Sequence, residues 1–201
     1  MKNKLWFLLV ALGVQLAFIA CEETDEVDEY ANWSAQNQSF IDSIATVARR
    51  NADGTWKTYK AYDLSPDNDD VLTATYDNNN YIYCQVVKAG TGTSSPEVTD
   101  SIRVHYRAWF FNGKLMDESF RGDTLNTSIS VPPKFSMGST ITGWTTALLY
   151  MKEGDTWDVY IPYTLGYGTS GVSGVPGYSA LKYRINLVGV YPVGTAVPAW
   201  K

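Results

Sequence analysis

The side chains that most often carry enzyme chemistry are scarce in this sequence. His105 is the only histidine, and no G-x-S-x-G motif supplies the nucleophile of a serine hydrolase. No group of His, Cys and carboxylate residues has the spacing of metal ligands. We therefore expect any chemistry to need no nucleophile, histidine, metal or cofactor.

A glycine-rich stretch at residues 166–171 carries the letters G-x-G-x-x-G. Nucleotide binding by this motif requires a helix that opens at the last glycine, so that its N–H groups meet the pyrophosphate. The following residues, 172–177, contain two further glycines and a proline and cannot supply that helix. The net charge of −5 and the lack of a basic cluster also argue against nucleic-acid binding.

One helix is predicted ahead of the strands. Residues 34–50 place Phe40, Ile44, Val47 and Ala48 on one face of an amphipathic helix, with Ser34 as its N-cap and an end near residues 51–54. A short strand or irregular segment and a polar loop follow. The loop, residues 65–70, is rich in aspartate.

From residue 81 onward the pattern favours strands. Residues 102, 104, 106, 108 and 110 are apolar or aromatic and alternate along one predicted strand, which places them on a core face and His105 on the opposite, solvent-facing side. Asn112 and Gly113 predict a hairpin turn. Further strands are expected at 81–87, 114–117, 156–164 and 180–191.

A second, short helix is predicted between these strands. Trp144, Leu148 and Met151 recur at helical spacing, and Gly154 marks the end of the segment. One short helix among several strands predicts an α+β fold, with the helix on one face of a twisted antiparallel sheet.

The N-terminus has the pattern of an export signal. Lys2 and Lys4 precede an apolar run over residues 5–20, which is short for a membrane-spanning helix, although a retained anchor is the alternative. Residues 18–21 resemble the lipobox of bacterial lipoproteins, which implies lipidation of Cys21, with Phe18 in place of the usual Leu. An ordinary signal peptide with an incidental cysteine is the other interpretation. The acidic residues 22–29 then form a solvated tether or a surface-export signal.

An ordered series of motifs fills the second half of the chain. It runs through VHYRAWFFNGKLMDES, KFSMG, ITGWTTALLYMKEGDTWDVYIPYTLGYG and VPGYSALKYRINLVGV. In this order and spacing, residues 80–192 resemble the FKBP-type peptidyl-prolyl cis/trans isomerase domain. The resemblance implies an antiparallel sheet wrapped around one short helix, preceded by an N-terminal helical extension within residues 21–79 and followed by a tail at 193–201.

The resemblance also implies a prolyl pocket between sheet and helix. Trp144 would form its floor, Ile141 would offer a backbone N–H, and Tyr167 would donate a phenolic hydrogen bond. The walls would include Tyr106, Asp117 and Tyr183, with Asp117 paired with Arg121 or serving the site. Further substrate contacts would come from the side chains Met116, Phe135, Thr140 and Val175.

Two departures from the family pattern bear on activity. Met116 replaces a usual Phe, and Pro133 replaces a second pocket aromatic. The expected function is isomerisation of X-Pro bonds in exported proteins, in a cell envelope and on the periplasmic or cell-surface side of an outer membrane through a lipid anchor. Macrolides are further expected ligands. The alternative is an FKBP-like peptide-binding, chaperone or scaffold module with little turnover, in which the aromatic residues serve core packing.

Overall fold

The structure, a computed structural model, describes residues 30–64 and 77–200. Two α-helices accompany the strands: α2 (Trp33–Arg50) and the short α3 (Thr142–Leu148). No helix in these two ranges is both long and apolar enough to cross a membrane. The strands are β1 (Trp56–Lys60), β2 (Tyr81–Lys88), β3 (Ser101–Phe110), β4 (Leu115–Glu118), β5 (Lys134–Ser136), β6 (Thr156–Ile161) and β7 (Leu181–Tyr191).

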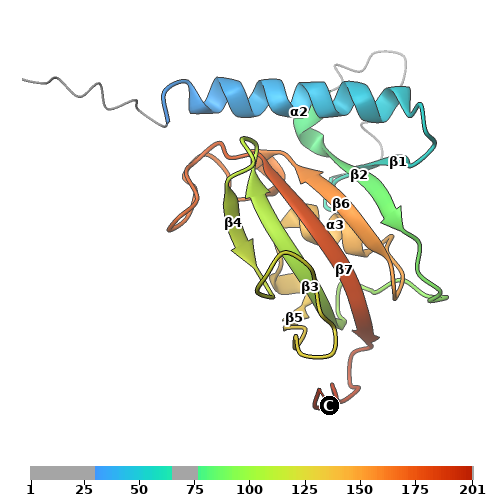
Figure 1. The fold of residues 1–201 in the computed structure, drawn as a ribbon. Helices are drawn as coiled ribbons and strands as arrows, with labels where there is room; N and C mark the ends of the chain where they lie inside the picture. The colour runs from blue at the N-terminus through green and yellow to red at the C-terminus, as the bar shows by residue number, and fades with distance from the viewer. Residues whose placement is uncertain (1–29, 65–76, 201) are drawn as a thin grey trace, which may run out of the picture. The chain divides into compact units, whose positions relative to one another are not determined.

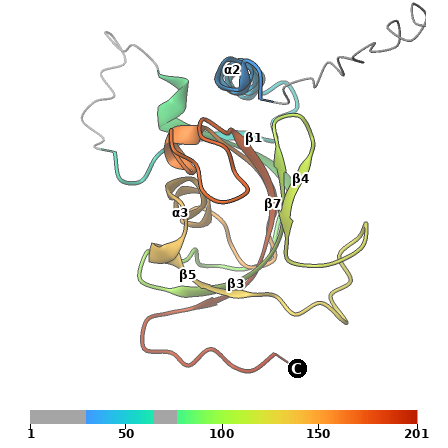
Figure 2. The same cartoon turned by 90° about the vertical axis from the view of Figure 1, so that its left-hand side faces the viewer.

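The strands form one antiparallel sheet in the order β1-β2-β6-β7-β3-β4, with β5 paired to β3. The sheet curves around α3, which lies against its concave face (Figure 2). The alternation predicted for β3 is confirmed, because Ile102, Val104 and Ala108 are fully buried on that face. The α+β fold of a twisted antiparallel sheet around one short helix is therefore confirmed.

The turn predicted at Asn112 and Gly113 joins β3 to β4. Gly113 has φ +83°, a left-handed conformation that costs glycine no steric energy, and its N–H donates to the Phe110 carbonyl at 3.0 Å. The Asn112 side chain accepts from the Lys114 N–H at 3.1 Å. The hairpin fixes β4 beside β3 and so sets the position of Asp117.

The first helix differs in detail from the sequence prediction. α2 begins at Trp33 with Asn32, not Ser34, at the N-cap, and it ends at Arg50 where Asn51 turns left-handed. Val47, predicted on the apolar face, is 45% exposed. The buried face is instead Trp33, Asn37, Ile41, Ala45 and Ala48.

This buried face rests on the strands, as Figure 1 shows for α2 across the end of the sheet. Ile41 and Ala45 pack with Tyr83 of β2 and Tyr160 of β6. Trp56 of β1 stacks on Tyr160 with ring centroids 5.5 Å apart. The helix and β1 therefore belong to the same compact unit as the rest of the sheet, Asn32–Lys201.

α3 is shorter than predicted, since it ends at Leu148, although Met151 is still fully buried. Gly143 brings its first turn against β6. A Cβ atom at this position would lie 2.4 Å from the Ile161 Cγ2 atom, so only glycine permits the contact. As predicted, no helix opens at Gly171, and residues 172 and 175 form an isolated bridge instead.

Candidate prolyl-binding site

A cavity of about 250 Å³ opens between the start of α3 and the concave face of the sheet. Strands β3, β4, β5 and β7, the segment before α3 and the glycine-rich loop all contribute to it. Its lining residues are Tyr106, Asp117, Phe135, Ser139, Thr140, Ile141, Trp144, Tyr167 and Tyr183.

Trp144 lies at the centre of an aromatic cluster. Its indole meets Tyr106 and Tyr183 edge-on at centroid distances of 5.2 Å each, and Phe135 at 5.7 Å. Edge-to-face packing of this kind fixes ring orientation and adds to the burial energy. The indole Nε1 is buried and has no acceptor among the residues that the structure describes. The cluster gives the cavity a rigid, apolar floor.

The backbone carbonyl and the backbone N–H of Ile141 differ in their hydrogen bonding. The Ile141 carbonyl caps the start of α3 by accepting from the N–H groups of Trp144 at 2.9 Å and Thr145 at 3.1 Å. The Ile141 N–H donates to no acceptor in the described part of the chain. An unpaired donor beside an apolar cavity is suited to a carbonyl oxygen from a ligand.

The polar side chains of the cavity are three phenols, the hydroxyls of Ser139 and Thr140, and the carboxylate of Asp117. The Tyr106 hydroxyl donates to Asp117 Oδ2 at 2.7 Å, and the Glu118 N–H donates to Asp117 Oδ1 at 2.8 Å. The partner of Asp117 is thus Tyr106 and not Arg121, which the sequence had suggested. Hydrogen-bonding from β3 to β4 holds the carboxylate at the rim.

Burial keeps the phenols of Tyr106 and Tyr183 protonated. It raises the pKa of Tyr106 above its ordinary value of 10.0, and the hydrogen bond to Asp117 raises it further. Burial likewise raises the pKa of Tyr183, with a smaller contribution from Tyr167. Both hydroxyls therefore remain neutral and able to donate hydrogen bonds at physiological pH.

The structure brings together eight of the ten side chains named from the sequence for this pocket. Met116 and Val175 do not line the cavity, since both pack against the hydrophobic core, and Val175 is only 7% exposed. Ser139 lines it without having been predicted. No sequence signal marks Ser139, because it enters through the turn at η3 (Met137–Ser139). Cys21 lies outside the described residues.

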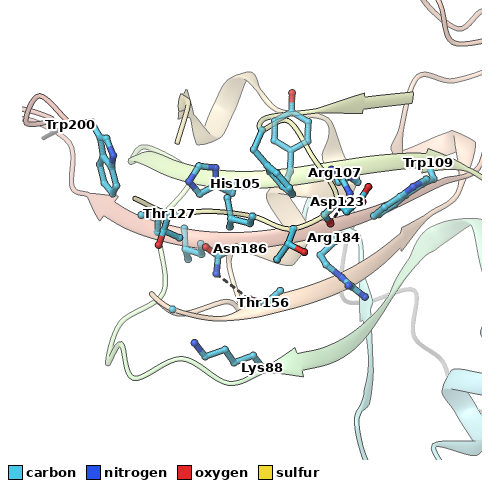
Figure 3. Close-up of a pocket in the computed structure, with 17 residues that line it drawn as sticks. Lys88, His105, Arg107, Trp109, Asp123, Thr127, Thr156, Arg184, Asn186 and Trp200 are labelled. Carbon is cyan, nitrogen blue, oxygen red and sulfur yellow. Dashed lines mark hydrogen bonds between the residues drawn. The ribbon is translucent and has the colours of Figure 1, made fainter. Parts of the chain in front are cut away.

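A second, larger hollow of about 730 Å³ lies on the opposite face of the sheet (Figure 3). Its two arginines are paired with carboxylates: Arg107 with Glu118 at 2.8 Å, and Arg184 with Asp158 at 2.6 Å. Asp158 also accepts Lys182 at 3.1 Å. These pairs neutralise the two arginines of the hollow, and the aromatic cluster around Trp144 lies on the other face.

His105 lies in this second hollow, and its predicted exposure to solvent is wrong. The side chain is only 1% exposed, because Ser119 and Phe120 fold back over the outer face of β3. Its Nδ1 lies 3.4 Å from the Ser119 hydroxyl, and its Nε2 has no partner in the described segments. Burial lowers the pKa of His105 below 6.5, so the folded protein favours the neutral imidazole.

Stability is therefore expected to fall as the pH decreases from 7 to 5. Below pH 6.5 the unfolded chain binds a proton at His105 more readily than the folded protein does. Protonation therefore stabilises the unfolded state relative to the folded state. The loss proceeds as the pH falls toward the folded pKa, at no more than about 1.4 kcal/mol per pH unit. In urea unfolding at several pH values, His105→Gln should show a flatter profile between pH 7 and 5. Equal slopes in both proteins would contradict the assignment.

Comparisons with known proteins agree with this geometry. Residues 92–188 match the family model of the FKBP-type peptidyl-prolyl cis-trans isomerase. The "Macrophage infectivity potentiator" of Trypanosoma cruzi is 36% identical over 108 residues, 53% of this chain and 51% of that protein. The "Peptidyl-prolyl cis-trans isomerase Mip" of Coxiella burnetii is 36% identical over 112 residues, 55% of this chain and 45% of that protein.

A solved structure is similar over a wider range. The crystal structure of FkpA from Escherichia coli superposes with a TM-score of 0.59 at 26% identity, covering 81% of this chain and 62% of that one. The chain spans about half the length of these two curated relatives. The matched motifs, the curved sheet around α3 and the aromatic cavity coincide in one segment. Residues 92–188 therefore match the FKBP-type family in sequence, and the chain has the FKBP-like fold.

Proposed function

We propose that this protein is a peptidyl-prolyl cis/trans isomerase that acts on X-Pro bonds of exported proteins. The observation that carries the proposal is the aromatic cavity around Trp144, whose walls are Tyr106, Phe135 and Tyr183. Beside it lies the unpaired N–H of Ile141. An apolar floor with a donor at its edge fits a pyrrolidine ring and the carbonyl attached to it.

The chemistry needs only differential binding. Resonance holds the X-Pro amide planar with a barrier of about 18 to 20 kcal/mol. Twisting the bond removes the charge separation of the planar form, so an apolar site disfavours the planar form relative to the twisted one. Each 1.36 kcal/mol of such preference gives about tenfold in rate. Ring contacts and one or two hydrogen bonds are enough for substantial catalysis.

The proposed roles follow from position in the cavity. Trp144 would support the proline ring, and the Ile141 N–H would bind the carbonyl that follows the proline. Tyr167 would donate its phenolic hydrogen to the substrate. Asp117, held by Tyr106, would set the polarity of the rim. Phe135, Thr140 and Tyr183 would complete the walls.

The cellular setting is part of the proposal. One curated relative, from Legionella longbeachae, is named "Outer membrane protein MIP". Together with the export signal and the lipobox-like residues 18–21, this supports an envelope protein tethered through a lipid on Cys21. Mass spectrometry of the protein from a membrane fraction would test the lipid, and an unmodified Cys21 would exclude it.

A protease-coupled assay on the fragment from residue 30 tests the activity. We expect cis-to-trans conversion of a proline-containing tetrapeptide to exceed the spontaneous rate in proportion to protein concentration. The alternative is a peptide-binding or chaperone module, which the substitutions Met116 and Pro133 favour. Binding of the peptide without acceleration, in a folded sample, would select that alternative.

A further inference from the structure

Two side chains of α2 bond to the end of the glycine-rich loop, more than 140 residues away in sequence. Asn37 is 1% exposed, and its Oδ1 accepts from the Ala180 N–H at 2.7 Å. The Trp33 Nε1 donates to the Ser179 hydroxyl at 3.1 Å. That hydroxyl in turn donates to the Pro176 carbonyl at 2.6 Å. Both contacts are buried, and together they bond two consecutive loop residues, Ser179 and Ala180, to the helix.

Both the oxygen and the nitrogen of the Asn37 side-chain amide make hydrogen bonds. Its Nδ2 donates to the Trp33 carbonyl at 2.7 Å while its Oδ1 holds Ala180. A buried amide is costly unless its hydrogen bonds are made, and a leucine would fill the same space more cheaply. The polar residue at this core position therefore specifies where the loop end must lie.

The loop that α2 holds is the one that brings Tyr167 to the cavity. Its two sides cross in close contact, with the Tyr178 N–H donating to the Gly168 carbonyl at 2.9 Å. A Cβ atom on Gly177 would lie 1.9 Å from the Thr169 carbonyl oxygen. Displacement of residues 177–180 would therefore displace the backbone next to Tyr167.

Tyr178 supplies independent evidence that the loop end is held in place. Its φ is +62°, in the left-handed region that a bulky residue adopts only at an energetic cost. Such a conformation persists when the surrounding structure enforces it. Ser179 and Ala180, the next two residues, are the ones bonded to α2.

We propose that Asn37 and Trp33 are positioning residues, through which α2 holds the glycine-rich loop so that Tyr167 faces the cavity. The inference rests on the proposed isomerase function. It extends the functional unit beyond residues 92–188, because α2 precedes that segment. The helix thus acts on the site through the loop and not by contact with substrate.

The test is Asn37→Leu in the fragment from residue 30, which keeps the side-chain volume and removes the acceptor for Ala180. We expect faster hydrogen exchange at the Ala180 amide and a roughly tenfold lower kcat/KM for a proline peptide, with most of the loss in kcat. Ala45→Gly is the matched control, since it weakens the same helix and leaves both loop contacts intact. It should keep kcat/KM within about twofold of the parent.

Should Asn37→Leu fail to fold, Ser179→Ala tests the Trp33 contact without altering α2, although it also removes the hydrogen bond from Ser179 to the Pro176 carbonyl. Faster hydrogen exchange at the Ala180 amide with both kcat and kcat/KM unchanged would overturn the positioning role. Equal losses in Asn37→Leu and Ala45→Gly would do the same, because helix stability alone would then explain them. If the parent fragment shows no turnover, the proposed function fails. Hydrogen-exchange rates at the Tyr178 and Ala180 amides then test whether α2 holds the loop, and unchanged rates in the variants would overturn that claim.

Discussion

A chain that begins at residue 77 is expected to melt roughly 15 °C or more below a chain that begins at residue 30. The shorter chain lacks α2 and β1, whose removal uncovers Tyr83 of β2, a fully buried residue, and Tyr160 of β6. Loss of the buried Trp33 alone should cost about 3 to 5 kcal/mol. In a domain of this size, 1 kcal/mol shifts Tm by about 2 to 4 °C. Thermal unfolding followed by circular dichroism measures the difference.

The matched comparison is a chain that begins at residue 22, which adds only the acidic run before residue 30. It should melt within a few degrees of the chain from residue 30. Should the chain from residue 77 melt at nearly the same temperature as the longer two, α2 and β1 would be an independent attachment. The domain proposed for residues 80–192 would then fold alone.

Trp144→Ala is expected to lower kcat/KM about a hundredfold, which corresponds to about 2.7 kcal/mol of transition-state stabilisation. The substitution removes the cavity floor and the ring against which Tyr106, Phe135 and Tyr183 pack. It should also cost about 3 to 5 kcal/mol of stability, because Trp144 is only 5% exposed. Activity must therefore be measured at a temperature where the variant is folded.

Trp157→Ala separates these two effects. Trp157 is 3% exposed, belongs to the same core and, like Trp144, has no acceptor for its Nε1 within residues 30–64 and 77–200, but it does not line the cavity. A similar loss of stability with kcat/KM within about threefold of the parent is the expected result. Comparable activity losses in both variants would show that Trp144 acts as a core residue.

Most of the strands were predictable because they carry their burial pattern locally, whereas β5, of only three residues, was not among the expected strands. Leu181, Tyr183, Ile185 and Leu187 alternate along β7 and are all buried, as the sequence suggested. The turn at Gly113 was equally local. Strand alternation and turn residues are local features of a few consecutive residues, so they can be recognised without knowing the long-range contacts.

The face of α2 was harder to predict because a polar residue defines it. Asn37 is buried for its hydrogen bond to Ala180, which hydrophobic periodicity does not reveal. The stripe centred on Phe40 and Ile44 was therefore rotated from the buried one, which includes Ile41 and Ala45. The partner that decides the rotation lies on a loop near the other end of the chain.

The site could be predicted where motif residues lie on regular elements. Tyr106 on β3, Trp144 on α3 and Tyr183 on β7 all reach the cavity. Met116 and Val175 do not, and His105 is buried by the backbone that follows β4. Met116 lies on β4 next to Asp117, and successive side chains of a strand point to opposite faces, so the two do not both face the cavity. The positions of Val175 and His105 depend on how loops fold over the sheet, which is a long-range property of the chain.

The most direct test of the central claim is exchange spectroscopy by NMR on a short X-Pro peptide. With a small fraction of the fragment from residue 30 present, we predict cross-peaks between the cis and trans proline signals that are absent from the peptide alone. Chemical shift changes should centre on the Trp144 indole N–H and the Ile141 amide. A folded protein that produces no cis/trans exchange, or that binds the peptide away from these two groups, would contradict the account.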